Sequence, residues 1–383
     1  MTEIYRKIAF LTGSRGEWGY IRPILRLIEK DPDLDYVIIA TNMHLLSEFG
    51  SSIHEIEKDG FEVEEKIFMT YDGYNSVTMV KSLGSLLLEL PTVLNRIKPE
   101  ILVLAGDRGE QLMGAICGVH MGIPVAHIQA GELSGNVDGI VRHSITKLSH
   151  IHFAANEEFA ERVKRLGEEE FRVFITGAPL VDELVNGIIT EKEELIEKYN
   201  INEKLPLILS VQHPVTEEEE MAGEQVYETI RALFEFDSQI IFIFPNSDAG
   251  SELIRNQIQK NLKPNIKVFR NLPRQDYLGF LKISSCIVGN SSSGIMEAPT
   301  FGIPCVNIGR RQNRRLQALN VINVNYDKDK IKDAIKIALS DEFREKAKKA
   351  INPYGDGHAS ERILKILKEI EINEKLLLKE LTY

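Results

Sequence analysis

The stretch ILVLAGD, residues 101–107, is an apolar run of strand-forming residues that ends in Gly and Asp. PVAHIQAG, residues 124–131, repeats this pattern after a helix-like interval. Runs that are apolar on both faces are typical of parallel strands covered by helices on each side. Four more runs of the same kind lie on either side of these two: KIAFLTG (7–13), YVIIAT (36–41), IHFAAN (151–156) and RVFITGAP (172–179). The first half of the chain therefore predicts an α/β fold with a parallel sheet.

The pattern restarts in the second half, after the charged helix-like stretch TEKEELIEKYNIN at residues 190–202. The later runs are LPLILSVQHP (205–214), IIFIFPN (240–246), IKVFR (266–270), CIVGNSS (286–292) and PCVNIG (304–309). We therefore expect two Rossmann-like domains, residues 1–190 and 191–357, which would form a ligand cleft if they face each other. The last segment, 358–383, has Ile and Leu at helical spacing and predicts a helix that packs against one or both domains.

Composition and charge exclude several function classes. The 383 residues carry a formal net charge of -11, so we expect no nucleic-acid partner. The three cysteines, Cys117, Cys286 and Cys305, lie singly in apolar surroundings, without the spacing of a zinc site or a disulfide framework. The apolar run in residues 1–16 is shorter than a signal-peptide core or a membrane span, which favours a cytoplasmic protein without a membrane partner.

Polar clusters follow the predicted strands, where ligands bind in open α/β sheets. In GSRGEWGY, residues 13–20, backbone N–H groups and Arg15 could face a phosphate, although a surface-turn arginine fits equally well. In AGDRGE, residues 105–110, Asp107 could act as an acid or base, or merely cap the next helix. Arg108 beside it could bind an anion or pair with a carboxylate.

The longest polar cluster is HIQAGELSGNVDGIVRHSITKLSH, residues 127–150. If Asp138 begins a helix, Arg142 lies four residues later on the same face, and a helix cap with an ion pair would explain both. The polar residues just upstream are more than one cap requires: His127, Gln129 and Glu132. The stretch therefore predicts a wall of a ligand site.

Three further clusters lie in the second half. His213 in SVQHP stands at a strand end, where a neutral imidazole could handle a proton near pH 7. The loop in GNSSSGIMEAPTFGIP, residues 289–304, suits a diphosphate or is a serine-rich helix cap, with Glu297 one turn into the helix. IGRRQNRR, residues 308–315, adds local positive charge, and Asn246 either contacts the nucleotide or forms a turn.

Taken in order, the clusters GDR, H-I-x-x-G-E-L-S-G-x-x-D-x-x-x-R-H, QHP, SSSG-x-x-E and GRRQ make the chain resemble a known family. It resembles the hydrolysing UDP-N-acetylglucosamine 2-epimerases of sialic and legionaminic acid synthesis, over roughly residues 7–360. The chain lacks the H-V-E-A-G-L-R-T and P-E-E-x-N-R motifs of the non-hydrolysing relatives. The resemblance implies a GT-B-like pair of Rossmann domains facing across a cleft, with the C-terminal helix packing back toward the N-terminal domain.

The resemblance also implies a reaction and roles for residues. Elimination of the nucleoside diphosphate and hydration of a glycal-like intermediate would convert UDP-N-acetylglucosamine to N-acetylmannosamine and UDP, without cofactor or metal. Motif positions expected near the reacting sugar are Asp107, Asp138, His213, Glu132, Gln129 and Arg142. Positions expected to bind substrate or nucleotide are Arg15, Arg108, Asn246, Ser291, Ser292, Glu297 and Arg311, with Glu297 on the ribose and the serines and Arg311 on phosphates. Family members usually form homodimers or homotetramers.

Gln129 departs from the family motif, which reads H-I-E at this point. An amide cannot exchange a proton near neutrality, so Glu132 or Asp138 would take over, or the substrate differs. The alternative substrate is UDP-N,N'-diacetylbacillosamine or its GDP counterpart, giving 2,4-diacetamido-2,4,6-trideoxymannose on the legionaminic acid route. Other readings are a non-hydrolysing epimerase, a non-catalytic nucleotide-sugar binder and a glycosyltransferase of the same fold.

Overall fold

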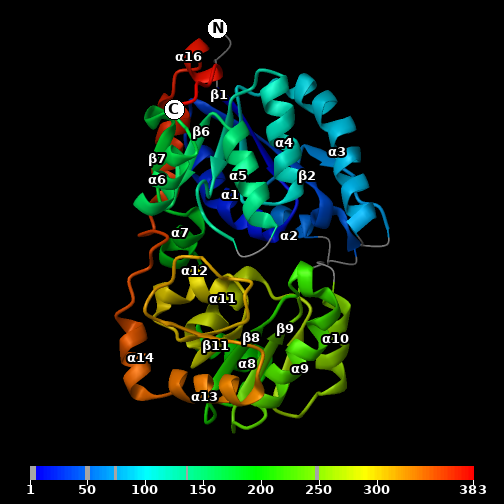
Figure 1. Cartoon of the computed structure of the whole chain (residues 1–383), viewed down its shortest axis with the longest axis vertical. Helices are drawn as coiled ribbons and strands as arrows, with labels where there is room; N and C mark the ends of the chain where they lie inside the picture. The colour runs from blue at the N-terminus through cyan, green and yellow to red at the C-terminus, as the bar shows by residue number, and fades with distance from the viewer. Residues whose placement is uncertain (1–5, 48–51, 73–75, 135–136, 246–249) are drawn as a thin grey trace. The chain divides into compact units, whose positions relative to one another are not determined.

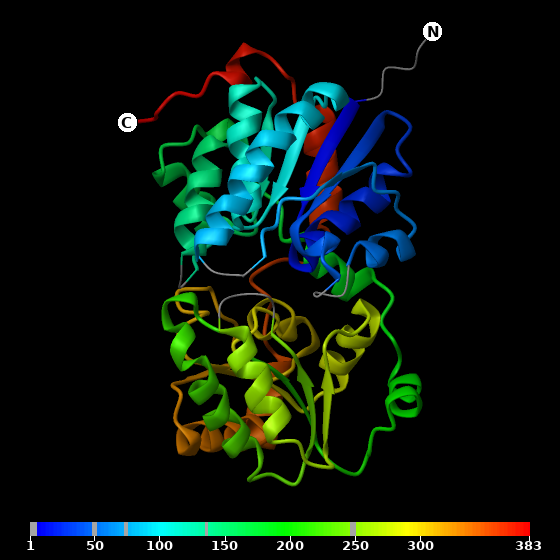
Figure 2. The ribbon, with the colours of Figure 1, turned by 90° about the vertical axis from the view of Figure 1, so that its right-hand side faces the viewer.

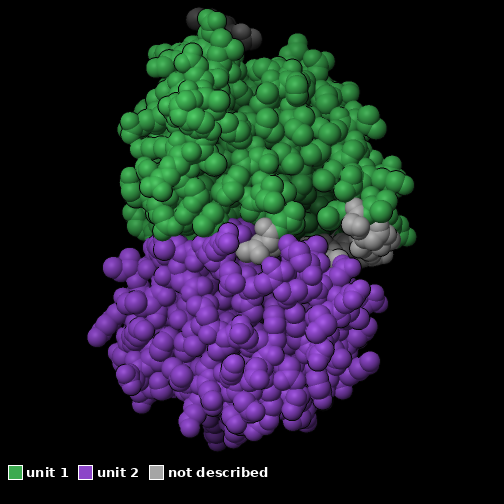
Figure 3. All heavy atoms as spheres, viewed as in Figure 1, with its two compact units in different colours: residues 1–133, 137–183, 354–383 green, residues 134–136, 184–353 purple. Residues whose placement is uncertain are grey.

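The computed structural model describes residues 6–47, 52–72, 76–134, 137–245 and 250–383. The chain forms two compact units, which are coloured separately in Figure 3. Unit 1 comprises residues 1–133, 137–183 and 354–383, and unit 2 comprises residues 134–136 and 184–353. Each unit has its own sheet and its own apolar core, as the alternation of apolar runs and helical segments predicts.

Unit 1 contains a seven-stranded parallel sheet in the order β3-β2-β1-β4-β5-β6-β7, of which Figure 1 labels β1, β2, β6 and β7. Its strands are β1 (Arg6–Thr12), β2 (Leu34–Thr41), β3 (Glu65–Ile67), β4 (Ile101–Ala105), β5 (Val125–Ile128), β6 (Ile151–Ala154) and β7 (Val173–Ile175). Its helices are α1 (Arg15–Ile28), η1 (Asn42–Leu45), α2 (Ile53–Lys58), α3 (Ser76–Ile97), α4 (Gly109–His120), α5 (Asp138–Leu148), α6 (Glu157–Arg165), η3 (Glu170–Arg172), α15 (Ala359–Glu369) and α16 (Glu374–Leu377), with α7 (Pro179–Asn186) at the boundary. The strand order reverses between β1 and β4, which makes their carboxyl ends the switch point where ligands bind.

Unit 2 contains a six-stranded parallel sheet in the order β10-β9-β8-β11-β12-β13. Its strands are β8 (Leu207–Val211), β9 (Gln239–Ile243), β10 (Ile266–Phe269), β11 (Cys286–Gly289), β12 (Cys305–Ile308) and β13 (Val321–Val324). Its helices are α8 (Lys192–Tyr199), η4 (Thr216–Met221), α9 (Ala222–Leu233), α10 (Ser251–Lys260), α11 (Arg274–Ile283), α12 (Ser293–Met296), η5 (Ala298–Phe301), α13 (Lys328–Ala338) and α14 (Asp341–Lys348). Here the switch point lies between β8 and β11.

Burial on both faces explains why most strands are legible in the sequence. All five residues of β4 are buried, and side chains of α3, α4 and α5 share one core cluster with β1, β2, β4 and β5. The edge strands β3 and β13 are not among the predicted apolar runs. β13 is half-buried or exposed at all four positions, and β3 buries one residue of three, so neither needs a continuous apolar run. The predicted α/β class with two Rossmann-like domains is confirmed.

The C-terminal helix α15 packs on helix α1 of unit 1, as the fold prediction states (Figure 2). Ile363 and Leu367 are fully buried on its inner face. The guanidinium of Arg6, at the start of β1, donates hydrogen bonds to the carbonyls of Leu367, Lys368 and Ile370 at 2.7–2.9 Å. These carbonyls lie at the end of α15 and lack helical partners. Arg6, near the N-terminus, supplies the hydrogen-bond donors that they need.

Helix α3 is long and apolar enough, over Val77–Ile97, to span a membrane by length and composition. Its residues Leu86, Leu90 and Leu94 are fully buried in the core of unit 1, at the spacing of one helix face. The apolar composition of α3 is therefore that of a helix packed on a sheet. Among the described residues, it is the one helix that meets the length and hydropathy criteria.

Candidate active site

Arg142 on α5 lies between two carboxylates at the carboxyl end of the unit 1 sheet. Its side chain is fully buried, and its Nη2 donates to Oδ2 of Asp107, in the loop after β4. Its Nη1 lies 3.7 Å from Oε2 of Glu132, in the loop after β5. The Nε of Arg142 is buried and has no hydrogen-bond partner within the described residues. The guanidinium therefore holds both carboxylates in place.

Gln129 occupies the position where the family motif has a carboxylate. It is 6% exposed and adopts a left-handed backbone conformation, with φ of 69°. Its Nε2 donates to Oε2 of Glu132 at 2.8 Å and to the hydroxyl of Tyr20 at 2.5 Å. The amide therefore donates to a carboxylate that a second carboxylate at this position would repel.

Gly131 fixes the path of this loop. Its φ is 78°, and a Cβ there would lie 2.2 Å from the carbonyl oxygen of Phe159. Only glycine fits this approach, which turns the chain after β5 so that Gln129 and Glu132 meet.

His127 is a structural residue of the same stretch. It is fully buried, and burial lowers its pKa to about 3. The neutral ring donates from Nε2 to the carbonyl of Gly106 at 2.8 Å, and its Nδ1 accepts from the hydroxyl of Thr146 at 3.1 Å. His127 thus ties the loop that carries Asp107 to helix α5, which carries Arg142.

Asp138 is the first residue of α5 and is half-buried. Val137 occupies the cap position and makes no side-chain cap hydrogen bond, so Asp138 is not the residue that caps this helix. Asp138 and Arg142 are four residues apart and share a helix face, as the sequence predicts. Arg142 nevertheless contacts Asp107 and Glu132, which lie in loops after neighbouring strands.

Arg15 and Arg108 both lie near carboxylates. The Nε of Arg15, at the start of α1, is 3.2 Å from Oε1 of Glu55, and its side chain is over one-third exposed. The Nε of Arg108 is 3.1 Å from Oε1 of Glu110. Of the two roles that the sequence leaves open for Arg108, the structure shows the carboxylate pair.

Glu17 and Glu110 form a buried acidic pair at the switch point that was not predicted from the sequence. Glu17 accepts hydrogen bonds from the backbone N–H groups of Gly13 and Ser14, and Ser14 caps α1 in return. Burial, with repulsion from Glu110, raises the pKa of Glu17 well above its ordinary value. The spacing Ser14-x-x-Glu17 is a capping-box signature, so the sequence did carry a signal for this helix start.

In unit 2, Asn290 gathers two of the predicted loops. Its Oδ1 accepts from the backbone N–H of His213 at 2.6 Å, and its Nδ2 donates to the carbonyl of His213 at 2.8 Å. The carbonyl of Asn290 accepts from Nη1 of Arg311 at 3.2 Å and from Nε2 of Gln312 at 2.8 Å. His213 and Arg311 are thus brought together at the switch point of this sheet, although Asn290 itself was not predicted.

Glu297 is held by two donors in unit 2. Nη2 of Arg274 donates to its Oε1 at 2.5 Å, and the hydroxyl of Ser293 donates to its Oε2. Burial and the neighbouring Glu297 raise the pKa of Tyr277, which also hydrogen-bonds Ser293. Arg274 and Tyr277, on α11, were not predicted because no local motif marks them.

The serine loop leads into a single helical turn. α12 spans Ser293–Met296, and Glu297 is its C-terminal cap residue, followed by the 3₁₀ turn η5. Glu297 thus lies one turn after the start of the helix, where the sequence places it, and Pro299, within η5, has no N–H to donate to a continuing α-helix. Ser291 and Ser292 precede the turn and are half-buried.

The arginines of the basic cluster 308–315 have different partners. Arg310 pairs with Glu217 and Glu218 of η4, while Arg315 contacts the sulfur of Met296 at 2.9 Å. Asn246 lies outside the described residues. Within the described part of the chain, no group of three or more His, Cys, Asp or Glu side chains is placed to hold a metal ion.

Residues 26–368 match the profile of a family described as UDP-N-acetylglucosamine 2-epimerase. The chain belongs to this family. The resemblance seen in the sequence motifs is thereby confirmed at the level of the family.

Curated relatives of this epimerase-family chain are similar over most of their length. It is 37% identical to a UDP-N,N'-diacetylbacillosamine 2-epimerase (hydrolyzing) of Legionella pneumophila, over 97% of this chain and 98% of the relative. It is 36% identical to a GDP/UDP-N,N'-diacetylbacillosamine 2-epimerase (hydrolyzing) of Campylobacter jejuni, over 83% and 84%. It is 33% identical to a UDP-N-acetylglucosamine 2-epimerase of Neisseria meningitidis, over 88% of each.

The fold of the epimerase-family chain is also found among solved structures. A crystal structure of UDP-GlcNAc 2-epimerase from Neisseria meningitidis bound to UDP-GlcNAc superposes with a TM-score of 0.80 at 19% identity. The alignment covers 94% of this chain and 99% of the other. At this identity the similarity establishes the shared fold.

Proposed function

We propose that this protein is a hydrolysing nucleotide-sugar 2-epimerase whose substrate is UDP-N,N'-diacetylbacillosamine. The observation that carries the proposal is the cluster of Asp107, Glu132 and Arg142 at the unit 1 switch point, with Gln129 in place of a third carboxylate. Two of the three relatives described above carry names that state a hydrolysing diacetylbacillosamine epimerase, which supports this substrate.

In the proposed reaction a base removes the proton from carbon 2, and the bond from carbon 1 to the diphosphate oxygen breaks. UDP leaves with the electron pair, and carbons 1 and 2 become doubly bonded. A proton then adds to carbon 2 on the opposite face, and water adds to carbon 1. One water is consumed, and the products are UDP and the free 2-epimeric sugar. This sequence needs one proton acceptor and one proton donor on opposite faces of the ring.

Asp107 and Asp138 are proposed as the acid and base. Asp107 has 18% of its side chain exposed, and Asp138 is half-buried, so both are accessible to a ligand. Glu132 has only 1% of its side chain exposed and accepts from Gln129, which suits a positioning role. Arg142 would hold Asp107 in place for the reaction.

Unit 2 is proposed to bind the nucleotide. Ser291, Ser292 and Arg311 would contact the diphosphate, and Glu297 would accept hydrogen bonds from the ribose hydroxyls. Both oxygens of Glu297 are already oriented by Arg274 and Ser293, so a ribose would meet a preorganised carboxylate. His213, fixed through its backbone by Asn290, is proposed to assist departure of the diphosphate. Arg15 and Arg108 remain proposed anion contacts.

UDP-N-acetylglucosamine is the second candidate substrate, favoured by the 33% identical relative of that name. The two sugars differ at carbons 4 and 6. The test is to incubate the purified protein with each nucleotide sugar separately, and to follow UDP and free sugar together by proton NMR and mass spectrometry.

Equal amounts of UDP and free 2-epimer from the diacetylbacillosamine substrate, at least tenfold faster than from the other, would support the proposal. A mixture of epimeric UDP-sugars without free UDP would instead establish a non-hydrolysing epimerase. Tight binding of both nucleotide sugars without turnover would establish a binding protein.

A homodimer or homotetramer in the cytoplasm is part of the proposal. The outer face of α3 exposes Val80 and Leu88 by 66% and 78%, which suits contact with a second subunit. The three cysteines are buried and unpaired, as is usual for a reducing compartment. Light scattering of the purified protein measures its oligomeric state. Leu88→Glu should lower the molecular mass measured in this way if α3 forms the contact between subunits.

A further inference from the structure

The C-terminal tail, residues 371–383, follows α15 and lies beyond the part of the chain that matches the family profile, which ends at residue 368. Arg172, fully buried at the end of η3, binds this tail by its backbone. Its guanidinium donates to the carbonyls of Leu376, Lys375 and Leu378 at 2.5, 2.7 and 3.0 Å. Three main-chain contacts from one buried arginine hold the tail in a defined position.

Lys379 binds the tail to the rest of unit 1. Its side chain is 16% exposed, and its ammonium group meets three acceptors: the carbonyls of Lys147 and Ser149 at 2.7 and 2.6 Å, and Oε2 of Glu168 at 2.6 Å. An ammonium has three protons, so every donor is satisfied. Lys147 and Ser149 lie at the C-terminal end of α5, where carbonyls lack helical partners and a positive charge is favourable.

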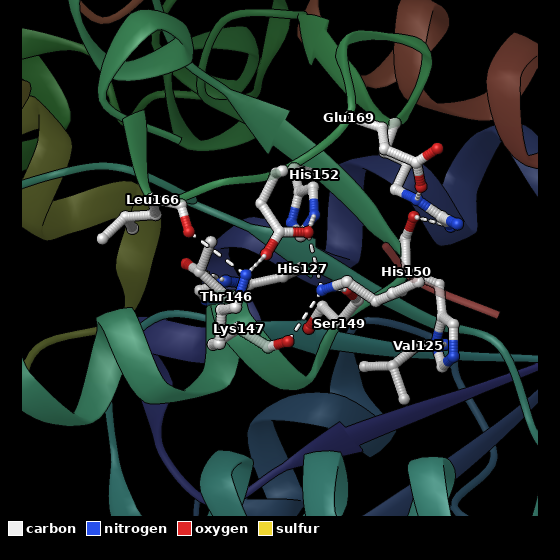
Figure 4. Close-up of polar contacts among 12 residues, drawn as sticks. Val125, His127, Thr146, Lys147, Ser149, His150, His152, Leu166 and Glu169 are labelled. Atoms are coloured by element: carbon white, nitrogen blue, oxygen red, sulfur yellow. Dashed lines mark hydrogen bonds and ion pairs between the residues drawn. The ribbon is translucent and has the colours of Figure 1, made fainter. Parts of the chain in front are cut away.

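Glu168 connects Lys379 to the rest of unit 1. Figure 4 shows polar contacts of this region, with Lys147, Ser149 and His152 among the labelled residues. The side chain of Glu168 is fully buried and accepts from Nζ of Lys147 at 2.8 Å, while Nε2 of His152 lies 2.9 Å away. Burial alone would raise the pKa of Glu168, but hydrogen bonds from His152, Lys147 and Lys379 lower it to about 2. The carboxylate is therefore the charged centre on which helix, sheet and tail converge.

The same network reaches the candidate active site from the sheet. His152 on β6 pairs in register with His127 on β5, and His127 bonds Gly106, the residue before Asp107. Helix α5 is thus held at its C-terminal end and near its middle. Its C-terminal end is bound by Lys379, and Arg142, two turns toward its N-terminus, binds Asp107 and Glu132.

We propose that the C-terminal tail positions helix α5 for catalysis, with Lys379 as a cap supplied from outside the helix. Lys379 is a positioning residue, since it acts through α5 and Arg142 on the carboxylates of Asp107 and Glu132. The inference rests on the proposed function of those residues. It assigns a role in turnover to a segment outside the family profile.

The cap should weaken as Lys379 loses its proton. Burial lowers the pKa of Lys379 to about 8, against the opposing effect of Glu168. The groups that face it are Glu168, Lys147, Arg172, His150 and His152, and Glu168 stays ionised throughout the alkaline range. Turnover should therefore fall as the pH rises through about 8, because the neutral amine has fewer donors and no charge for Glu168.

The test compares Lys379→Met with Lys379→Arg and with the matched control Lys375→Met, an exposed lysine of the same tail. We expect Lys379→Met to lower kcat about 10- to 100-fold through misplacement of the α5 side chains. KM and the Kd for UDP should change less than twofold, since the proposed diphosphate and ribose contacts of Ser291, Ser292, Arg311 and Glu297 lie in unit 2. Lys379→Arg should restore most of kcat, Lys375→Met should match the wild type, and the alkaline decline should vanish in Lys379→Met.

Hydrogen exchange supplies a readout that does not depend on turnover. Amides of residues 138–148 should exchange faster in Lys379→Met than in Lys375→Met. Unchanged exchange there, or an unchanged kcat in Lys379→Met, would overturn the inference. An equal loss of kcat and UDP affinity would also overturn it, because it would indicate general destabilisation. If the wild type turns over no nucleotide sugar, the proposed function fails, and the exchange experiment still decides whether the tail orders α5.

Discussion

The guanidinium of Arg142 binds the carboxylate of Asp107, and the two residues come from a helix and a strand end that are 35 positions apart in the sequence. The arginine is fully buried and also faces Glu132. A single cation thus orders two acidic groups of the candidate site, Asp107 and Glu132. It also makes the site sensitive to loss of that cation.

Replacing Arg142 with Met should leave two carboxylates facing a buried apolar side chain. We expect a loss of about 3–5 kcal/mol in the free energy of unfolding, the usual effect of breaking a buried ion pair. We also expect at least a 100-fold loss of kcat, since the charge that holds Asp107 is gone. Urea unfolding measures the loss of stability, and the rate of product formation measures the loss of kcat. Arg142→Lys keeps the charge and should lose less in both, and wild-type stability of Arg142→Met would contradict the burial of this pair.

Gln129→Glu should place a second carboxylate against Glu132, at the position where an amide now donates at 2.8 Å. Repulsion raises the folded-state pKa of this carboxyl pair above the unfolded value of about 4.3. The destabilisation is therefore small below that pH and grows as the pH rises through the folded-state pKa. Urea midpoints at pH 5 and pH 8 should differ more for Gln129→Glu than for wild type. Gln129→Met, which cannot ionise, is the control and should show no added pH dependence.

Asp138→Asn should abolish turnover and leave nucleotide binding largely intact, since Asp138 belongs to unit 1 and is proposed to exchange a proton. A loss of at least 100-fold in kcat is expected from removal of a general acid or base, which contributes about 10²–10⁴-fold. Calorimetry with UDP should give a Kd within about threefold of wild type, a change below 1 kcal/mol. Wild-type turnover by Asp138→Asn would remove this residue from the mechanism.

Glu297→Gln should weaken UDP binding about tenfold or more, because one charged acceptor for the ribose is lost. Arg274→Met should have a similar effect through loss of the orienting contact to Glu297. The specific readout is the comparison of UDP with 2'-deoxy-UDP. Wild type should prefer the ribose form, and both variants should lose that preference. A preference that survives in Glu297→Gln would show that another group reads the ribose.

Acid should destabilise unit 1 steeply through its buried histidines. Burial lowers the pKa values of His44 and His127 to about 3 and those of His150 and His152 to about 4. In the unfolded chain the pKa of a histidine is about 6.5. Below that pH the unfolded chain binds four protons that the folded chain does not bind, so the free energy of unfolding falls by up to about 5 kcal/mol for each unit of decrease in pH. The effect begins below about pH 7, weakens near pH 4, where His150 and His152 become protonated in the folded chain, and ends near pH 3, where His44 and His127 do so. Urea unfolding at pH 7.5, 6 and 5 measures the slope, and His127→Gln should reduce it by about a quarter.

Much of the fold could be predicted because parallel strands buried on both faces need continuous apolar runs. β4 and β5 are such strands, and their loops carry Asp107 and Gln129 in recognisable motifs. The edge strand β13 was not predicted, because half-buried positions place no such demand on the sequence.

Contacts made through the fold could not be predicted. Asp107 and Arg142 each stand in a motif, but nothing local states that they bind each other. Arg274 lies in a helix with no motif of its own, and only the packing of α11 brings it to Glu297. Lys379 is further still from any motif, since its acceptors lie more than 200 residues earlier in the chain.

The proposed reaction releases UDP by elimination at carbon 2, and water then adds to carbon 1. It is tested most directly by running the reaction with UDP-N,N'-diacetylbacillosamine in D₂O and, separately, in H₂¹⁸O, and examining both products by NMR and mass spectrometry. We predict one deuterium at carbon 2 of the free 2-epimer, and UDP that contains no ¹⁸O. Free sugar with protium retained at carbon 2, or ¹⁸O in the released UDP, would contradict the account.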